Sequence, residues 1–203
     1  MAWAQLVETR GSLPASRVLG RALPGFVLDL DATIVACHSE KEAAAPTWKH
    51  TFGYHPLFCF LDSTGEALAG LLRSGNAGSN TAADHITVLG QALQQIPDAY
   101  RYGSPILIRS DSAGSSHEFL AHIRSLREHG VHTEFSVGVA ITTPIRAAIT
   151  AATDWIPALD GDGSLREGAQ LVELTDLIDP VLLAGFPAGT RLICRRERPH
   201  PGA

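Results

Sequence analysis

Runs of hydrophobic residues predict five strands in the first two thirds of the chain. The clearest run covers residues 26–35, follows Gly25 and is rich in branched side chains, as in a buried strand. Four further runs predict strands at 54–61, 67–73, 105–109 and 133–139. The turn signal Asp62-Ser-Thr-Gly65 joins the second and third strands as a hairpin.

Apolar residues at helical spacing predict three helices, at 80–96, 117–128 and 144–152. Asn80 is a candidate cap for the first helix, and Ser115 or Ser116 for the second, which Gly130 ends. Thr143 is a candidate cap for the third, with proline in its first turn. The predicted order is strand, strand, strand, helix, strand, helix, strand, helix.

Three regions follow from this pattern. Residues 1–24 contain Gly11, Pro14, Gly20 and Pro24, which break any long helix, and are interpreted as a linker or the remnant of an N-terminal region. Residues 25–153 hold the predicted strands and helices and form the core. Residues 154–203 have a pattern of short strands, predicted around 170–174 and 191–195, with a turn at Asp160-Gly-Asp-Gly163. They are interpreted as a truncated β-rich insertion.

Composition indicates a packed globular protein. Hydrophobic residues make up 45% of the 203 residues and charged residues 18%, which argues against disorder. No apolar run approaches the roughly 20 residues that span a bilayer, and the chain does not begin like a signal peptide, so a cytoplasmic protein without a membrane segment is expected. The three cysteines, Cys37, Cys59 and Cys194, show no CxxC spacing, which argues against disulfides and a zinc site.

The strongest candidate chemistry comes from three aspartates. Three antiparallel strands followed by crossover helices and parallel strands form the ribonuclease H-like pattern, an α/β fold with a mixed sheet, in which the fourth strand lies beside the first. Asp29 and Asp31 lie on the first strand, pointing to one face, and Asp111 ends the fourth strand. Carboxylates brought together in this way suit divalent ions such as Mg²⁺. The alternatives are pairing of Asp29 and Asp31 with water or an arginine, and helix capping by Asp111.

Six motifs in series resemble bacterial DDE insertion-sequence transposases, most closely the insertion-sequence group numbered thirteen-eighty. The motifs are Phe26-Val-Leu-Asp-Leu-Asp-Ala-Thr33, His38-Ser-Glu-Lys-Glu42, Gly53-Tyr-His-Pro56, Gly75-Asn-Ala-Gly-Ser-Asn-Thr81, Ile108-Arg-Ser-Asp-Ser-Ala-Gly114 and Arg195-Arg-Glu-Arg-Pro-His-Pro-Gly202. The resemblance covers most of residues 25–203, and its specificity lies in the order of the series.

The resemblance implies a ribonuclease H-like fold with a β-strand insertion before the last catalytic helix. It also implies metal-dependent strand cleavage at transposon ends and strand transfer to target DNA. Asp31 matches the first catalytic carboxylate, with Asp29 as the less favoured choice, and Asp111 matches the second. Two Mg²⁺ or Mn²⁺ ions are expected in the complete site.

The third catalytic residue of that family, a glutamate on a later helix, has no counterpart in this chain. Glu167, Glu173 and Glu197 fall in the predicted insertion and show no sign of such a helix. The resemblance therefore implies a catalytic-domain fragment that is inactive alone. The full-length protein is expected to bind DNA and to form a homodimer.

The net charge of −5 is unusual for a DNA-binding protein. Either the DNA-binding parts lie outside this chain, or the DNA interpretation is wrong. Residues proposed to contact DNA are Lys41, Lys49, Arg195, Arg196 and Arg198. The alternative is that these are ordinary solvated residues, or charges that protect a strand edge from aggregation.

Two other functions remain open at this stage. A hydrophobic strand followed by Asp-x-Asp-x-Thr is also the first motif of haloacid dehalogenase-like phosphatases, with Asp29 as nucleophile and Asp31 as general acid/base. That enzyme would need a later basic residue and an acidic pair, for which Arg146, Asp160 and Asp162 are weak candidates. The third possibility is a non-catalytic remnant that keeps the folded core.

Overall fold

The computed structural model describes residues 2–11, 13–38, 40–78 and 81–198. The chain divides into two compact units. The first comprises residues 1–16 and 24–139, and the second comprises residues 17–23 and 140–203. The predicted core and insertion meet at residue 154, whereas the units divide after residue 139. The predicted helix at 144–152 consequently belongs to the second unit.

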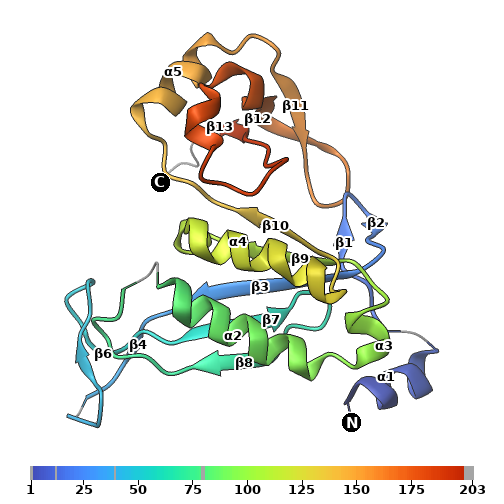
Figure 1. Cartoon of the computed structure of the whole chain (residues 1–203), viewed down its shortest axis with the longest axis vertical. Helices are drawn as coiled ribbons and strands as arrows, with labels where there is room; N and C mark the ends of the chain where they lie inside the picture. The colour runs from blue at the N-terminus through green and yellow to red at the C-terminus, as the bar shows by residue number, and fades with distance from the viewer. Residues whose placement is uncertain (1, 12, 39, 79–80, 199–203) are drawn as a thin grey trace. The chain divides into compact units, whose positions relative to one another are not determined.

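A five-stranded mixed sheet forms the centre of the first unit (Figure 1). Its strands are β3 (Phe26–Ala32), β7 (Leu57–Leu61), β8 (Glu66–Leu71), β9 (Ile106–Ser110) and β10 (Thr133–Val137). Their spatial order is β10-β9-β3-β7-β8. β3, β7 and β8 pair antiparallel, whereas β9 pairs parallel to both β3 and β10. The fourth predicted strand therefore lies beside the first, as the sequence pattern predicts.

Two amphipathic helices cover one face of this sheet (Figure 1). They are α2 (Ala82–Gln95) and α4 (His117–Ser125), and a short helix, α3 (Asp98–Arg101), precedes β9. The residues that fill the interface are fully buried apolar side chains: Leu28, Leu30, Val88, Leu89, Ile106, Ile108, Phe119, Leu120 and Ile123. Burying such side chains is the main favourable contribution to folding.

The helix boundaries follow the predicted signals closely. Ser116 accepts a hydrogen bond from the Phe119 amide at 3.3 Å and caps α4, as predicted. A short 3-10 helix, η2 (Leu126–His129), follows, and Gly130 ends it with a positive φ of 79°. The predicted cap Asn80 lies outside the described residues, and Thr81 occupies the N-cap position of α2.

Residues 33–56 form a β-rich arm between β3 and β7. The arm contains β4 (Val35–Ala36), β5 (Ala45–Pro46) and β6 (Phe52–Tyr54), which pair in the order β4-β6-β5. The sequence pattern predicts one continuous strand from 54 to 61. The structure differs because Pro56, which has no backbone N–H, separates β6 from β7.

The N-terminal segment is not simply a linker, because residues Ala2–Arg10 form helix α1. The Trp3 side chain is 7% exposed and packs edge-on against Phe26, with 5.5 Å between ring centroids. Tyr100 contributes a third ring, 6.1 Å from Trp3. The glycine and proline breaks lie after this short helix, and the packing of Trp3 on Phe26 and Tyr100 attaches the helix to the core.

The second unit is a small α/β unit built on a three-stranded antiparallel sheet. The sheet has the order β11 (Ile156–Leu159), β12 (Leu165–Glu173), β13 (Ile193–Glu197). Helix α5 (Thr143–Ala151) packs Ala148 against Val172, Leu174 and Ile178. Its N-cap is Thr142, one residue before the predicted cap. The short 3-10 helices η3 (Thr175–Leu177) and η4 (Pro180–Leu183) lie between β12 and β13.

Residues 17–23 contribute a two-stranded hairpin to this unit. The hairpin pairs β1 (Arg17–Val18) with β2 (Arg21–Ala22). Gly20 at its turn donates a backbone hydrogen bond to the Gly161 carbonyl at 2.8 Å. Gly20 has a φ of +72°, and a Cβ there would lie 3.1 Å from the Asp162 carbonyl oxygen, so glycine suits this position.

Replacing Trp3 with alanine tests the role of α1. The change removes the ring that packs on Phe26 and Tyr100, so we expect a loss of about 3 kcal/mol in the free energy of unfolding, measured by urea denaturation. Gln5→Ala on the same helix alters an exposed side chain and is the matched control. Equal stability of the two variants would show that α1 does not hold to the core.

Candidate functional site

Asp31 and Asp111 lie at neighbouring positions on the two central parallel strands. In the pairing of β3 with β9, the last register partners are Leu30 and Ser110, and an aspartate follows each of these two residues. Adjacent strands lie about 4.8 Å apart. Both side chains are exposed. The structure therefore brings the two predicted carboxylates to the same edge of the sheet in the same register.

Asp111 also performs the capping role that was its structural alternative. It is the N-cap of the 3-10 helix η1 (Ser112–Gly114), and its Oδ1 accepts a hydrogen bond from the Ala113 amide at 2.8 Å. This bond fixes the direction of the carboxylate. The described residues form no ion pair with Asp111 or Asp31.

Asp29, by contrast, is held by an arginine. Arg109 on β9 donates two hydrogen bonds to the Asp29 carboxylate, at 2.6 and 2.7 Å, and a third to Asp62 at 2.7 Å. The hydrogen bond to Asp29 is the largest cause of the raised pKa of Arg109. A carboxylate that accepts a bidentate arginine is less suited to hold a metal ion. Among the described residues, Asp31 has no such arginine partner.

The glycine-rich segment before α2 leaves the sheet at the same edge. β8 runs in the same direction as β3, because both are antiparallel to β7. The chain after β8 and the start of α2 therefore lie at the carboxyl end of β3. The arm begins at this edge as well, directly after Ala32.

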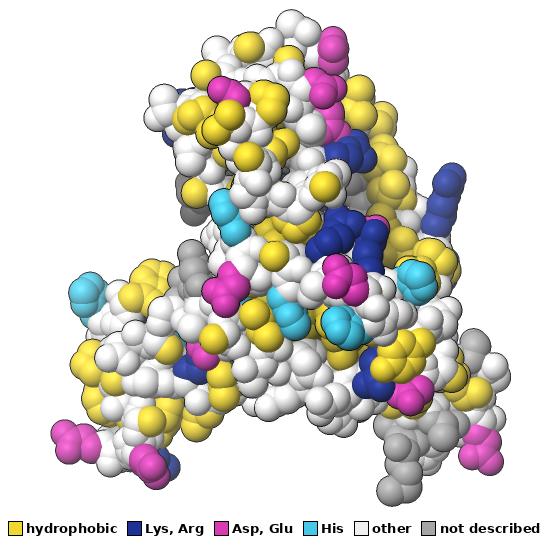
Figure 2. Space-filling model, viewed as in Figure 1, with side chains coloured by type: hydrophobic (Ala, Val, Ile, Leu, Met, Phe, Trp, Pro, Cys, Tyr) yellow, Lys and Arg dark blue, Asp and Glu magenta, His cyan; other side chains and the backbone are white. Residues whose placement is uncertain are grey.

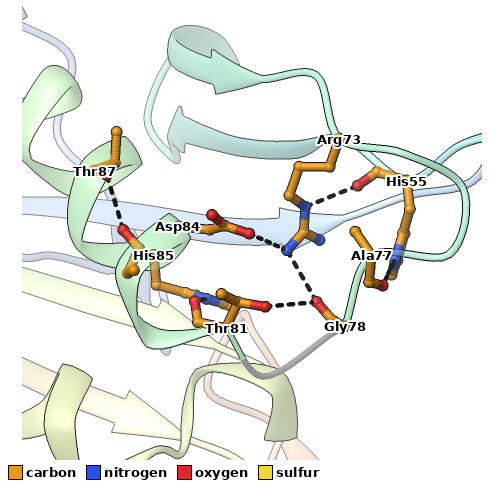
Figure 3. Close-up of polar contacts among 9 residues, drawn as sticks. His55, Arg73, Ala77, Gly78, Thr81, Asp84, His85 and Thr87 are labelled. Atoms are coloured by element: carbon orange, nitrogen blue, oxygen red, sulfur yellow. Dashed lines mark hydrogen bonds and ion pairs between the residues drawn. The ribbon is translucent and has the colours of Figure 1, made fainter. Parts of the chain in front are cut away.

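A buried arginine ties these segments together (Figure 3). Arg73 is 6% exposed, and its Nε donates to the His55 carbonyl at 2.9 Å. Its Nη1 donates to the Gly78 carbonyl at 3.1 Å and to the Asp84 carboxylate at 3.2 Å. One side chain thus links the arm, the glycine-rich segment and the first turn of α2.

His85 is a buried histidine near Asp111 that the sequence pattern did not single out. Its side chain is 1% exposed, and Nδ1 lies 2.9 Å from the Thr81 carbonyl, while Nε2 has no hydrogen-bond partner among the described residues. Burial lowers the pKa of His85, and the nearby charge of Asp111 opposes that shift. Its place on the apolar side of α2, three and four residues before Val88 and Leu89, was the available signal.

The glutamates weighed as a third carboxylate are placed elsewhere. Glu167, Glu173 and Glu197 all lie on strands of the second unit rather than on a helix. Glu173 pairs with Arg191, and Glu197 accepts from Arg166 at 2.6 Å. Across the described ranges, no group of three His, Cys, Asp or Glu side chains is placed to hold a metal ion.

The arginines near the C-terminus make contacts within their own sheet. Arg196 donates to the Gln170 side chain at 2.9 Å and lies 3.8 Å above the Trp155 ring, and Arg195 lies 3.5 Å from Glu197. Lys41 and Lys49 lie on the arm and are exposed. On the face drawn in Figure 2, the described basic side chains lie in small groups beside acidic ones rather than in one continuous surface.

Comparison with known families identifies the class of protein. The family model described as "Transposase DDE domain group 1" matches residues 19–202. The chain therefore belongs to this family of DDE transposase domains.

Comparison with solved structures and curated proteins adds little further detail. A solved structure, the cryo-EM structure of the piggyBac transposase synaptic complex with hairpin DNA, matches with a TM-score of 0.44 and 12% identity. The match covers 74% of this chain and 30% of that one. No curated protein sequence matches the chain significantly. Within the described part of the chain, no helix is long and apolar enough to cross a membrane.

The pairing of Arg109 can be tested through stability. Asp29→Asn removes the charge that receives two hydrogen bonds, but Arg109 is 42% exposed, so solvent screening limits the expected loss to about 1 kcal/mol in the free energy of unfolding. Asp62→Asn removes one bond and should cost less. Asp98→Asn, whose carboxylate is 79% exposed, is the control and should change little in urea denaturation. If Asp29→Asn left the free energy of unfolding unchanged, that result would contradict the assignment of Asp29 to a structural ion pair.

The buried position of His85 predicts a pH dependence of stability. Because the folded state holds the pKa of His85 below 6.5, the unfolded state binds the proton more readily, and the free energy of unfolding should fall as the pH drops below 6.5. Above that pH both states are neutral and the contribution is constant. Urea denaturation at about pH 5.5 and about pH 7.5 measures the difference.

His85→Gln should flatten this dependence, because glutamine does not titrate. His122 is the control. Burial also lowers the pKa of His122, but its side chain is less buried than that of His85, so His122→Gln should flatten the curve less. An unchanged pH dependence in His85→Gln would contradict the burial of a neutral imidazole.

Proposed function

We propose that residues 24–139 are the incomplete ribonuclease H-like catalytic core of a bacterial insertion-sequence transposase of the group numbered thirteen-eighty. In the full-length protein this core would cleave DNA strands at transposon ends and join them to target DNA. The observation that carries the proposal is the register of β3 and β9, which sets Asp31 beside Asp111 at one sheet edge. The strand order β10-β9-β3-β7-β8 supports the fold assignment.

The donor set at this edge fits a hard divalent cation. DDE transposase domains generally use divalent metal ions, and carboxylate oxygens are the ligands that Mg²⁺ and Mn²⁺ prefer. Asp31 and Asp111 would hold the metal, and two such ions would activate the attacking oxygen and stabilise the leaving oxygen on phosphorus. The bond from the Ala113 amide would orient the Asp111 carboxylate, and Arg109 would keep Asp29 engaged away from the cation.

We propose that the third carboxylate lies outside this chain. The three glutamates of the second unit on β12 and β13 lie on strands, and two of them are ion-paired. Without that carboxylate the chain would bind metal weakly and would not cleave DNA by itself. The full-length protein would act as a homodimer on transposon ends and target DNA.

Among the residues proposed to contact DNA, the lysines are better placed than the arginines. Lys41 and Lys49 lie on the arm, which begins directly after Ala32, two residues after Asp31. Arg195 and Arg196 already have partners in their sheet, and a contact with phosphate would compete with those partners. Arg198 is exposed, and we propose that it also contacts DNA.

The phosphatase interpretation is disfavoured. In that enzyme Asp29 would be the nucleophile, but Arg109 occupies both of its carboxylate oxygens. The first strand leads into the β-rich arm, whereas the phosphatase fold places a helix there. A non-catalytic remnant would share this fold and would differ in failing to bind metal at Asp31 and Asp111.

Metal binding tests the proposed site directly. We expect Mn²⁺ binding, measured by electron paramagnetic resonance, to weaken at least about tenfold in Asp31→Asn and in Asp111→Asn, because loss of a supporting contact alone costs about 10- to 100-fold at known metal sites. Asp98→Asn, an exposed carboxylate at the start of α3, is the control and should bind Mn²⁺ like the wild type.

The same variants distinguish the alternatives. In a chain extended to include the third carboxylate, cleavage of transposon-end DNA should require both Asp31 and Asp111. Turnover of a small phosphate ester that is lost in Asp29→Asn would instead indicate the phosphatase. Wild-type Mn²⁺ binding that neither Asp31→Asn nor Asp111→Asn alters would overturn the proposed site.

A further inference from the structure

The tip of the arm exposes a tryptophan beside a lysine. Trp48 is 68% exposed, whereas Trp3 in the core is 7% exposed. The Lys49 ammonium lies 5.0 Å from the centre of the Trp48 ring, within the range of a cation–π contact. A large, flat indole that is exposed beside a cation offers a contact surface for a binding partner.

The tip is a tight, well-bonded turn that presents these two side chains outward. Thr47 is 5% exposed, its amide donates to the Thr51 carbonyl at 2.7 Å, and the two threonine hydroxyls lie 2.7 Å apart. The His50 amide closes the turn on the Thr47 carbonyl at 3.0 Å, and His50 has a positive φ of 61°. Trp48 and Lys49 therefore project from a defined hairpin.

The root of the arm is fixed to the sheet edge that carries Asp31 and Asp111. Tyr54 of β6 forms an isolated β-bridge with Ser74, and a Cβ on Gly75 would lie 2.2 Å from the Ala45 carbonyl oxygen. Next to this close contact, Arg73 binds the His55 carbonyl (Figure 3). Such close backbone packing and a buried arginine limit how far the arm can move relative to that edge.

The chemistry of the tip selects the partner. Lys49 and His50 are the basic residues of the turn from 47 to 51, while Glu40 and Glu42 flank Lys41 in the preceding part of the arm. A flat aromatic ring beside a cation matches a ligand with a planar face and a nearby negative charge. Unpaired nucleotides have both, since the base offers its face and the phosphate its charge. Paired bases inside a duplex hide their faces.

We propose that Trp48 stacks on an unpaired base of the DNA strand bound at the Asp31–Asp111 edge, and that Lys49 contacts the adjacent phosphate. This inference rests on the proposed function and adds a recognition role for an aromatic residue of the arm. The arm then distinguishes opened or single-stranded DNA from intact duplex.

Fluorescence anisotropy with a labelled single-stranded oligonucleotide and the matching duplex tests the inference. Trp48→Ala should weaken single-strand binding at least about fivefold, the lower end for loss of a base–aromatic stack, and should change duplex binding much less. Trp48→Phe keeps a ring and should restore most of the affinity. Lys49→Ala should lower the slope of log affinity against log salt by about 1.

Tyr102→Ala is the matched control. Tyr102 is 47% exposed and also lies under a cation, with 4.8 Å from the Arg101 guanidinium carbon to its ring, but it precedes β9 and lies at the opposite end of the parallel strands. Its loss should leave DNA binding unchanged. With 2-aminopurine in the oligonucleotide, stacking should quench the base fluorescence in the wild type and not in Trp48→Ala.

The outcomes separate this inference from the proposed function. The inference would be overturned if the wild type and Trp48→Ala bound single-stranded DNA equally well, or if neither bound DNA. Neither result would bear on the metal site, which Mn²⁺ binding tests separately. Loss of a dimer in Trp48→Ala, seen by sedimentation and without a change in single-strand affinity, would assign the tip to a contact between copies and also overturn it. If Mn²⁺ binding does not depend on Asp31 and Asp111 but single-strand affinity does depend on Trp48, only the proposed metal site is overturned.

Discussion

The ion pair between Arg109 and Asp29 joins the two central strands two residues before the candidate carboxylates. The pair aligns β3 with β9, so that Asp31 and Asp111 occupy equivalent positions. Register matters here because a slip of one residue turns every side chain of a strand to the other face. Leu28 and Leu30 would then leave the interface with α2 and α4, and Asp31 would enter it. Burial of the apolar face and placement of the acidic edge are therefore set by the same alignment.

The central sheet could be predicted because its strands are runs of branched residues separated by clear turns, and two helices have apolar residues at regular spacing. The partner of Asp29 could not, because Arg109 lies 80 positions later in the chain. Helix α1 escaped prediction because its attachment depends on Trp3 meeting two distant rings. The arm escaped because its strands are only two or three residues long and are defined by pairing rather than by an apolar pattern.

Part of the net charge of −5 lies in local ion pairs. Among the described residues, Arg73, Arg109 and Arg166 pair with five carboxylates, so these arginines are already engaged within the fold. Both lysines of the chain lie on the arm. A DNA strand bound at this edge would experience the local electrostatic field of the arm and of Asp31 and Asp111. A bound cation would offset the repulsion between these carboxylates and the phosphates.

The arm is inserted between two residues that already pair with each other. Ala32 at the end of β3 and Leu57 at the start of β7 are register partners, so the sheet is closed below the insertion. Segments that leave and re-enter a structure at adjacent points tolerate changes of length well. Changes of length at the tip of the arm, away from the contacts at its root, would therefore leave the pairing of β3 with β7 intact.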